Sequence, residues 1–427
     1  MRFHFFISLL MTMTYATAQA PFVTVQGHRF YRADAVYVPF GMNLWYGPDL
    51  GATAEGRARL DRELDRLAAL GINNLRVMAA SEGPDDQPWR VAPSLQPEPG
   101  VYREAWLRGL DYLLVAMAER DMTAVLVLGN FWPWSGGFGQ YVSWATGEAI
   151  PYPPPQEGGD WLTYQLFASR FFQHETALAQ YRALVHALLT RRNTLSGQPY
   201  RDDPTIMAWQ LANEPRGLQR GAAYRRWIRQ TATLIHALAP QQLVSIGSEG
   251  RTPSRLAGTH CQAVHRYAEI DYVTCHVWPQ NWEWYDPTRP EATWPAAEKK
   301  VRAYLQRHVR MAQRLDKPLV VEEFGLARDG GSHADSAATQ WRERYYALMM
   351  EAVQQSLQQG GPLCGLNFWA WGGEGRPDEA GGFWQVGDDL IGDPPHEHQG
   401  WYAIYHSDRS TLQLLREGGQ RLREALE

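Results

Sequence analysis

The stretch IMAWQLANEPRG (residues 206–217) changes from apolar to polar in its second half and carries Glu214 directly before Pro215. A continuous apolar run is typical of a strand covered on both faces, and a proline straight after it ends the strand. The stretch KPLVVEEFG (317–325) has the same form and ends in a pair of glutamates. Two buried strands that finish on carboxylates predict a site built from the strand ends of a parallel sheet.

Eight segments of the chain have the length and composition of buried strands. They are rich in Val, Ile and Leu and nearly continuous rather than alternating, which is typical of parallel strands with helices on both faces. The segments are 35–45, 72–78, 123–130, 206–213, 243–249, 272–278, 318–324 and 364–371.

Helical patterns separate these strand segments. In 54–70 leucine recurs at helical spacing, and Gly71 is a natural stop. Similar patterns predict helices over 103–120, 161–192, 221–239, 293–315, 335–359 and 410–426, whereas 250–271 shows no helix of comfortable length. Eight strands with intervening helices predict an α/β protein with a (β/α)8 TIM barrel. The alternative, a doubly wound open sheet, lacks a Gly-rich nucleotide turn after the first strand.

Two long insertions interrupt the alternation, at 131–160 and 373–409. Each follows a predicted strand, the third and the eighth, so both are expected on the C-terminal face, where barrel enzymes keep their active sites. No repeat, low-complexity tract or linker indicates a second domain. We therefore expect a single catalytic domain over 21–427, with long loops on one face.

The first twenty residues, 1–20, have the pattern of a signal peptide. Arg2 supplies a charged start, an apolar core follows, and Ala18-Gln19-Ala20 offers a small-residue cleavage site. We expect cleavage after Ala20 and a secreted or periplasmic protein. The alternative is an uncleaved N-terminal strand or helix.

Composition narrows the possible partners. A net charge of −5, with both signs interspersed, gives no basic stripe and argues against nucleic acid. The chain has 18 Trp, 20 Tyr and 14 Phe, many of them in Gly- and Pro-rich segments, where exposed rings suit sugars; the others fill the core. Three cysteines are too few for a disulfide framework, and Cys275 and Cys364 are expected to be buried thiols.

Glu214 and Glu323 are predicted to converge across the barrel mouth from the fourth and seventh strands. Two convergent carboxylates are what retaining glycoside hydrolysis requires, one as proton donor and the other as nucleophile. Retention needs carboxyl groups about 5–5.5 Å apart and inversion about 6.5–9.5 Å. The alternative is that these residues are helix caps or salt-bridge partners.

The chain resembles glycoside hydrolase family 5, and within it the β-mannan-active subfamily. The resemblance covers nearly all of the mature chain and lies in GMNLWYG (41–47), NNLRVMAASEGP (73–84), NFWPWSGGFGQYVSW (130–144), DDPTIMAWQLANEPR (202–216), GSEG (247–250), IDYVTCHVWPQNW (270–282), KPLVVEEFG (317–325), GLNFWAWGGEGR (365–376) and GDDLIGDPPHEHQGWY (387–402). It implies Glu214 as acid/base and Glu323 as nucleophile. Independently, adjacent strand residues face opposite ways, so Glu322 is expected to support the site or to face a helix.

The resemblance also implies supporting residues. Arg76 would hydrogen-bond the nucleophile, Asn213 would contact the sugar 2-hydroxyl, and His276 and Trp278 would lie beside the nucleophile. Trp369 is expected as the aromatic floor under the sugar, with Trp371 as the alternative. Further candidates for sugar contact are Asn43, Trp45, Trp132 and Glu249, and Arg216 is expected on the leaving-group side.

The long insertions resemble those of exo-acting β-mannosidases more than the shorter loops of endo-β-1,4-mannanases, so the resemblance favours removal of mannose from chain ends. A β-glucan hydrolase and a non-catalytic carbohydrate-binding barrel remain as alternatives. The acids and histidines of 387–400 are expected in a solvated, proline-stiffened loop rather than a calcium or zinc site, and the resemblance implies neither metal nor cofactor.

Overall fold

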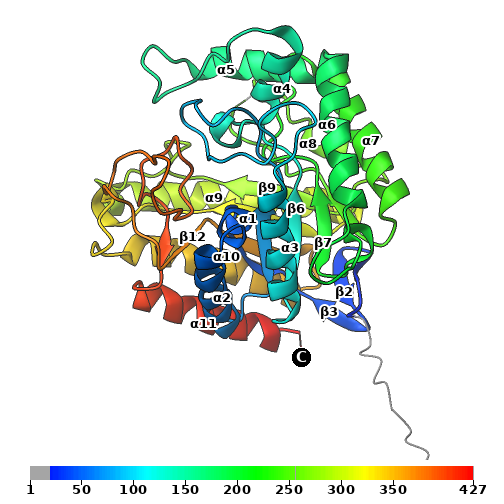
Figure 1. The fold of residues 1–427 in the computed structure, drawn as a ribbon. Helices are drawn as coiled ribbons and strands as arrows, with labels where there is room; N and C mark the ends of the chain where they lie inside the picture. The colour runs from blue at the N-terminus through cyan, green and yellow to red at the C-terminus, as the bar shows by residue number, and fades with distance from the viewer. Residues whose placement is uncertain (1–19, 255, 427) are drawn as a thin grey trace, which may run out of the picture.

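The computed structural model describes residues 20–254 and 256–426, so the predicted signal peptide lies outside the described residues except for Ala20. Its centre is a parallel sheet of eight strands in the order β8-β7-β6-β5-β4-β11-β10-β9 (Figure 1). The strands are β4 (Phe40–Asn43), β5 (Asn74–Met78), β6 (Thr123–Val127), β7 (Ile206–Gln210), β8 (Leu243–Ser245), β9 (Val273–Val277), β10 (Leu319–Phe324) and β11 (Leu363–Phe368). Seven of the eight predicted segments contain one of them, and the eighth, 364–371, overlaps β11, which begins one residue earlier.

The two edges of this sheet, β8 and β9, meet and close it into a barrel. The amide of Asp271 donates to the carbonyl of Val244 at 2.9 Å, and the amide of His276 donates to the carbonyl of Glu249 at 3.3 Å. All eight strands are buried along their whole length. The predicted (β/α)8 TIM barrel is therefore confirmed.

Helices surround the barrel and follow the predicted pattern closely. The long helices are α2 (Ala54–Ala69), α3 (Glu104–Ala118), α6 (Glu175–Thr190), α7 (Gly221–Leu238), α9 (Pro290–Leu315), α10 (Gln340–Gln358) and α11 (Arg409–Glu424). The shorter ones are α1 (Gly47–Gly51), α4 (Gly137–Thr146), α5 (Trp161–Ala168) and α8 (Cys261–His265), with 3-10 turns η1 (Pro133–Ser135), η2 (Ser169–Gln173), η3 (Tyr200–Asp202) and η4 (Asp329–Gly331). Only five-residue α8 crosses the segment where no comfortable helix was expected.

Two predicted elements are divided in the structure. The helix expected over 161–192 breaks into α5, η2 and α6, because Phe171 and Phe172 of η2 turn inward and pack on Trp227. The strand expected over 35–45 divides at Pro39, which has no amide hydrogen for a ladder. Its first part joins an antiparallel sheet of β1 (Val23–Gln26), β2 (Arg29–Arg32) and β3 (Ala35–Tyr37), which was not predicted. Phe30 of this sheet packs edge-on against Tyr272, just before β9, and so covers the N-terminal end of the barrel.

The two insertions lie on the opposite, C-terminal side. The first is not only loop, because it contains η1 and α4. The second begins at the last residue of β12 (Trp371–Gly373) and contains β13 (Ile404–Tyr405), which pairs with β12. The insertions approach each other where Trp161, directly after the first, meets the ring of His396 in the second, with centroids 5.9 Å apart. Within the described residues, none of the helices has the length and apolar character needed to cross a bilayer.

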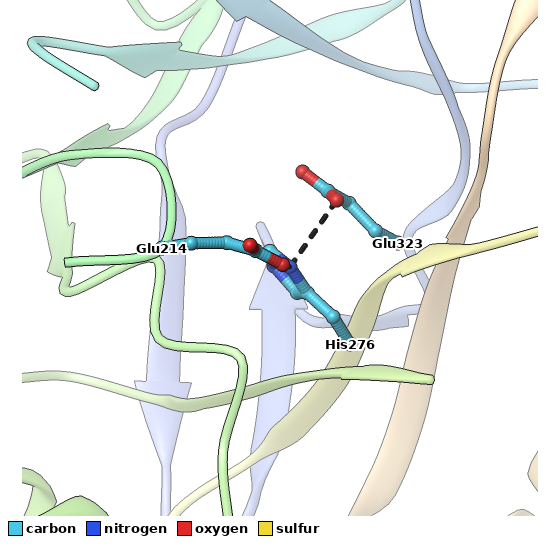
Figure 2. A group of neighbouring side chains, drawn as sticks. All are labelled: Glu214, His276 and Glu323. Carbon is cyan, nitrogen blue, oxygen red and sulfur yellow. Dashed lines mark hydrogen bonds and ion pairs between the residues drawn. The ribbon is translucent and has the colours of Figure 1, made fainter. Parts of the chain in front are cut away.

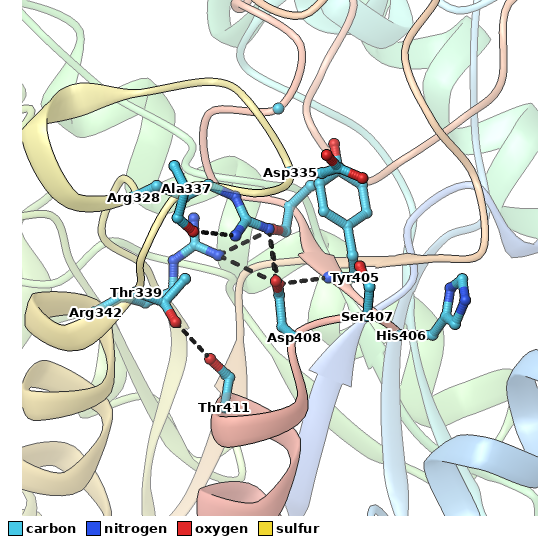
Figure 3. Close-up of polar contacts among 12 residues, drawn as sticks. Arg328, Asp335, Ala337, Thr339, Arg342, Tyr405, His406, Ser407, Asp408 and Thr411 are labelled. Carbon is cyan, nitrogen blue, oxygen red and sulfur yellow. Dashed lines mark hydrogen bonds and ion pairs between the residues drawn. The ribbon is translucent and has the colours of Figure 1, made fainter.

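A buried charge cluster, which we call the rim anchor, fastens the second insertion to the barrel (Figure 3). Its members are Arg328, Arg342 and Asp408. Both carboxylate oxygens of Asp408 accept from Arg328, at 2.9 and 2.8 Å, and one also accepts from the amide of Tyr405 at 2.9 Å. The guanidinium of Arg342 donates to the carbonyls of residues 326, 401 and 403. These contacts join the segment after β10 to the end of the insertion.

All three cysteines are buried and unbridged, as expected for Cys275 and Cys364. The segment 387–400, by contrast, is solvated only in part: residues 387, 389 and 398 are exposed, whereas 391–395 are buried. Asp393 is buried, and its carboxylate accepts from the amides of Gly400 at 2.9 Å and Tyr402 at 2.8 Å. These two hydrogen bonds hold the segment against the protein. The composition of the segment alone did not indicate this arrangement.

Candidate active site

Glu214 lies four residues beyond the end of β7, in a strained backbone position. Its φ is +48°, which is uncommon for a residue other than glycine. The amide of Glu214 donates to the carbonyl of Gly247 at 2.9 Å, and Asn213 pairs with Asn130 in an isolated parallel bridge. The chain after β7 is therefore held against both neighbouring strands, and the carboxylate of Glu214 projects into the barrel mouth. Such strain is concentrated at functional sites in proteins.

Glu323 lies inside β10, where the pairing with β9 is irregular. The register shifts between Val321 and Glu323, so the strict alternation of side chains is broken at Glu322. Both glutamates consequently point into the barrel. Glu322 is buried and accepts two hydrogen bonds from Nε2 of Gln210, at 2.9 and 2.7 Å. Of the two expectations for Glu322, support of the site fits these contacts, because Gln210 also accepts from Arg76, whereas the assumption of regular alternation in this strand is wrong.

His276 of β9 lies between the two carboxylates (Figure 2). Its Nδ1 is 2.6 Å from Oε1 of Glu214 and 3.2 Å from Oε2 of Glu323. Facing oxygens of the two carboxylates lie within 4.8 Å of each other, well below the spacing that inversion requires. The structure thus brings together the two glutamates predicted from strands four and seven, with an imidazole joining them.

Arg76 of β5 organises the base of this site. Its guanidinium donates to Oε1 of Glu323 at 2.5 Å and to Oδ1 of Asn213 at 2.8 Å. It also donates to Oδ1 of Asn43 at 3.1 Å and to Oε1 of Gln210 at 2.8 Å. Arg76 is almost fully buried and therefore fixes the nucleophile candidate by charge and by geometry together. We refer to Arg76, Glu214, His276 and Glu323 as the active-site cluster.

The electrostatics of the cluster favour a protonated imidazole. Burial lowers the pKa of His276, but the charges of Glu323 and Glu214 and their hydrogen bonds prevail and raise it to about 10. Burial likewise raises the pKa of Glu214, yet the hydrogen bond and charge of His276 and the charge of Arg216 lower it to about 2. At neutral pH the shared proton therefore lies on the imidazole, and the carboxylate of Glu214 is ionised.

Glu214, His276 and Glu323 are the only three potential metal ligands that the described residues bring together in this way. A metal would need the neutral form of His276, because an imidazolium has no free lone pair to offer. The raised pKa of His276 favours the protonated form, which already neutralises part of the carboxylate charge. The donor set therefore fits a proton better than a cation, and the prediction of no metal cofactor stays a prediction.

The cluster opens into a cavity of about 670 Å³ on the C-terminal face. Aromatic rings dominate its walls, and polar groups stand at intervals among them, which is the usual composition of a ligand site. The lining residues predicted from sequence are Trp132, Asn213, Glu214, Arg216, Glu249, Trp278, Glu323 and Trp369. Arg76 and His276 lie beneath them and reach the cavity only through the carboxylates.

Other predicted contacts are placed elsewhere. Trp371, the alternative floor, is fully buried and donates to Oε2 of Glu63 on α2, so Trp369 alone of the pair lines the cavity. Asn43 contacts Arg76 and not the cavity, and the side-chain amide of Asn43 donates to the backbone carbonyls of residues 322 and 368. Trp45 is buried as well, and its indole N–H donates a hydrogen bond to the backbone carbonyl of Gly392. Asn43 and Trp45 therefore support the site and do not reach a sugar in the cavity.

Three side chains contact one another in sequence on the side of the cavity where Glu214 lies: Glu249, Arg216 and Trp132. Both carboxylate oxygens of Glu249 accept from Arg216, at 2.6 and 2.8 Å, so Glu249 has less capacity for sugar hydroxyls than expected. The guanidinium carbon of Arg216 lies 4.8 Å above the ring of Trp132. The indole of Trp132 in turn donates to Oε2 of Glu214 at 2.7 Å.

Sequence reasoning missed most of the outer wall. These residues come from the segment after β9, from α5 and from the two insertions, and they include Trp134, Trp161, Gln165, Gln280, Asn281, Trp282, Phe383, His396, Glu397, His398 and Trp401. The available signal was the position of the insertions after strands three and eight. It indicated which segments reach the cavity but not which of their side chains face it.

Comparisons with known proteins identify similar chains. A family model described as "GH family 5 beta-mannosidase-like" matches residues 20–427. Mannan endo-1,4-beta-mannosidase 4 of Oryza sativa subsp. japonica is 31% identical over 77% of this chain and 68% of its own length. A glycoside hydrolase family 5 mannosidase from Rhizomucor miehei is 39% identical over 95% of this chain and 98% of its own, with a TM-score of 0.87. A glutamate-to-alanine mutant of that mannosidase, in complex with mannosyl-fructose, also has a TM-score of 0.87, with the same identity and coverage.

Proposed function

Because the chain belongs to glycoside hydrolase family 5, in its β-mannosidase-like group, we propose that it is a retaining exo-acting β-mannosidase. Its relatives are mannosidases and mannanases, so a glycosidase is the shared activity. More specifically, we propose that it cleaves β-1,4-mannosidic bonds at the ends of manno-oligosaccharides. The observation that carries it is the close pair of carboxylates, joined by His276 in an aromatic cavity. Secretion, inferred from residues 1–20, is part of the proposal.

Retention is supported by the spacing of Glu214 and Glu323. With facing oxygens within 4.8 Å, little room remains for a water molecule to attack from the side opposite the leaving group. Glu323, whose carboxylate accepts a hydrogen bond from Arg76, attacks the anomeric carbon and forms a glycosyl-enzyme, while the bond to the leaving oxygen breaks. Glu214 protonates that oxygen, and afterwards takes a proton from the water that hydrolyses the glycosyl ester.

The acid step needs a proton on Glu214, whereas the resting site holds it on His276. The two atoms are 2.6 Å apart, so the proton moves along an existing hydrogen bond without rearrangement. The pair titrates as a unit, and its proton is available wherever His276 remains charged. We propose that His276 stores the proton that Glu214 delivers, and that the same pair receives one when water attacks.

Exo action is supported by the walls of the cavity. Phe383, His398 and Trp401 of the second insertion line the cavity on its outer side, and Phe383 packs against Trp89, with centroids 5.4 Å apart. Glu397 also lines the cavity, and burial followed by the charges of Asp393, Glu323 and Glu214 raises its pKa well above its usual value. A carboxyl group at this point of the cavity wall can bind the hydroxyls of a chain end.

The test is a product time course on reduced mannohexaose with the wild type and Glu323→Ala. The proposal expects mannose as the first product and no product from the variant. Glu322→Gln serves as a matched control, since it changes the adjacent buried carboxylate without removing the attacking group. Retention is tested separately by the anomeric form of the first mannose released, followed by NMR: β-mannose supports it and α-mannose contradicts it.

A second candidate is an endo-β-1,4-mannanase, because the matched plant relative carries that activity in its name. Early mannobiose and mannotriose in the same time course would favour it. Hydrolysis of gluco-oligosaccharides in place of manno-oligosaccharides would favour a β-glucan hydrolase. Binding without cleavage by the wild type would leave a non-catalytic carbohydrate-binding barrel.

A further inference from the structure

Trp161 is an exposed tryptophan at the mouth of the active-site cavity. Its side chain lines the cavity and keeps 38% of its surface accessible, whereas Trp134, Trp278 and Trp369 of the same cavity are buried. An indole that is partly open to water at the mouth of an aromatic-lined cavity offers a flat apolar face to a ligand. None of the catalytic steps above uses it.

The neighbours of Trp161 place it on the side of Glu214. Its ring packs edge-on against Trp132, with centroids 5.5 Å apart and an interplanar angle of 87°. Trp132 donates to Oε2 of Glu214, the group that protonates the leaving oxygen. Trp369 and Trp278 also line the cavity and contact each other, with centroids 6.0 Å apart, and within the described residues neither ring contacts that of Trp161. Trp161 is therefore one ring further out from Glu214, along the path that a departing sugar takes.

The backbone presents Trp161 rigidly. It is the first residue of α5, and the carboxylate of Asp160 caps this helix by accepting from the amide and the hydroxyl of Thr163, at 2.6 and 2.7 Å. Gln165, one turn later, accepts from Arg216 at 2.9 Å and so ties α5 to the residue that follows Pro215. The ring is thus fixed relative to Glu214 before any substrate arrives.

We propose that Trp161 is the platform for the leaving-group sugar, on which the mannosyl unit beyond the cleaved bond stacks. This inference rests on the proposed function. Arg216 and Gln165 line the same part of the cavity and offer donors and an amide to the hydroxyls of that sugar. Trp161 accordingly determines specificity for leaving groups that are sugars, and takes no part in the bond-breaking itself.

The experiment compares two substrates that differ only beyond the cleaved bond. In mannotriose the leaving group is a disaccharide, whereas in β-mannosyl fluoride it is a fluoride ion that cannot reach Trp161. Trp161→Ala is expected to lower kcat/KM on mannotriose about five- to tenfold, mainly through KM, as the loss of one stacking contact implies. The kcat/KM on β-mannosyl fluoride is expected to stay within twofold.

Leu162→Ala is the matched control, because Leu162 is the next residue of α5, is 47% exposed and does not line the cavity. This variant is expected to leave kcat/KM unchanged on both substrates. Trp161→Phe keeps a planar ring and should restore part of the lost kcat/KM, while Trp161→Leu keeps apolar bulk without a plane and should not.

Three outcomes would contradict the proposal that the leaving-group sugar stacks on Trp161. Equal losses on both substrates would mean that Trp161 acts through Trp132 or His396 on the catalytic groups themselves. Unchanged kinetics in Trp161→Ala, or full recovery in Trp161→Leu, would remove stacking as its role. Failure of the wild type to cleave either substrate is a different result, because it would refute the mannosidase assignment on which the platform rests.

Discussion

The active-site cluster and the rim anchor are both buried groups of charge, and both depend on the end of β10. Glu323 lies within that strand, and Arg328 follows four residues after its end. In the active-site cluster, side chains bind side chains: the carboxylates meet Arg76, His276 and Trp132. In the rim anchor, the charged groups bind mostly backbone, including the carbonyls of residues 326, 337, 401 and 403.

This difference separates chemistry from architecture. A carboxylate held by side chains can change its protonation state or its partner while the backbone stays still. A guanidinium held by carbonyls cannot be released without freeing the loops that carry them. The active-site carboxylates also border the cavity, whereas Arg328 and Arg342 are entirely enclosed. The first cluster should therefore control rate and the second stability, and the predictions below test that division.

The largest expected effect is on catalysis. Glu323→Gln keeps the shape of the side chain and removes the attacking charge, so kcat/KM on mannotriose should fall about 10⁴-fold or more, or about 5.5 kcal/mol of transition-state stabilisation. The free energy of unfolding in urea should change far less. Kinetics and denaturation of the same preparation measure both. A loss of activity matched by an equal loss of stability would erase the distinction between the clusters.

The rim anchor should show the reverse behaviour. Asp408→Asn leaves Arg328 and Arg342 buried without their counter-charge, and breaking a buried ion pair in this way costs about 3–5 kcal/mol of folding free energy. Urea denaturation measures it, and kcat/KM of the protein that remains folded should fall less than tenfold. Asp335→Asn is the control, since its ion pair with Arg376 is partly exposed and is expected to contribute little to stability. If the fall in kcat/KM, converted to free energy, exceeded the loss in the free energy of unfolding, the rim anchor would have a role in catalysis.

The third prediction concerns the proton held between the carboxylates. Because the pKa of His276 is raised to about 10, its contribution to stability is present below pH 6.5 and lost as the pH rises toward 10. Activity should follow the same group. In His276→Gln only Glu214 can hold the proton, so the basic limb of the kcat/KM profile should move to lower pH.

His308→Gln provides the matched control for that experiment. Burial lowers the pKa of His308 to about 4, so this imidazole is neutral at neutral pH and lies outside the active-site cluster. Its replacement should leave the basic limb where it is in the wild type. A basic limb that is unmoved in His276→Gln as well would show that the proton is stored elsewhere.

The barrel could be predicted because its signals are local. Each strand is a continuous apolar run, and strand ends in a parallel barrel face one region, so Glu214 and Glu323 could be paired without coordinates. The identification of Arg76 and His276 beside them depended on family resemblance, and the roles of all four remain predictions. What strand logic alone supplied was convergence, and the structure confirms that the two carboxylates meet.

The remainder could not be predicted because it depends on contacts between distant segments. The register shift in β10 turns Glu322 inward, and nothing in the letters VVEEF signals it. Glu249 lies four residues after β8, just as Glu214 lies four residues after β7, yet Arg216 donates to both of its carboxylate oxygens. His396 appears in a polar, Pro-rich segment that reads as solvated, and it lines the cavity because buried Asp393 folds that segment inward.

The smallest expected effect comes from a charge group with neither role. Glu374, at the start of the second insertion, pairs with Arg62 and Arg66 on α2, and its pKa is lowered to about 2, chiefly by the hydrogen bond from Arg62. This stabilisation is present above pH 4.5 and lost as the pH falls toward 2. Because Arg62 is about half exposed, Glu374→Gln should cost only about 0.5 kcal/mol in urea denaturation, and less in high salt. A cost comparable to that of Asp408→Asn would mean that pairing, rather than enclosure by backbone carbonyls, gives the rim anchor its strength.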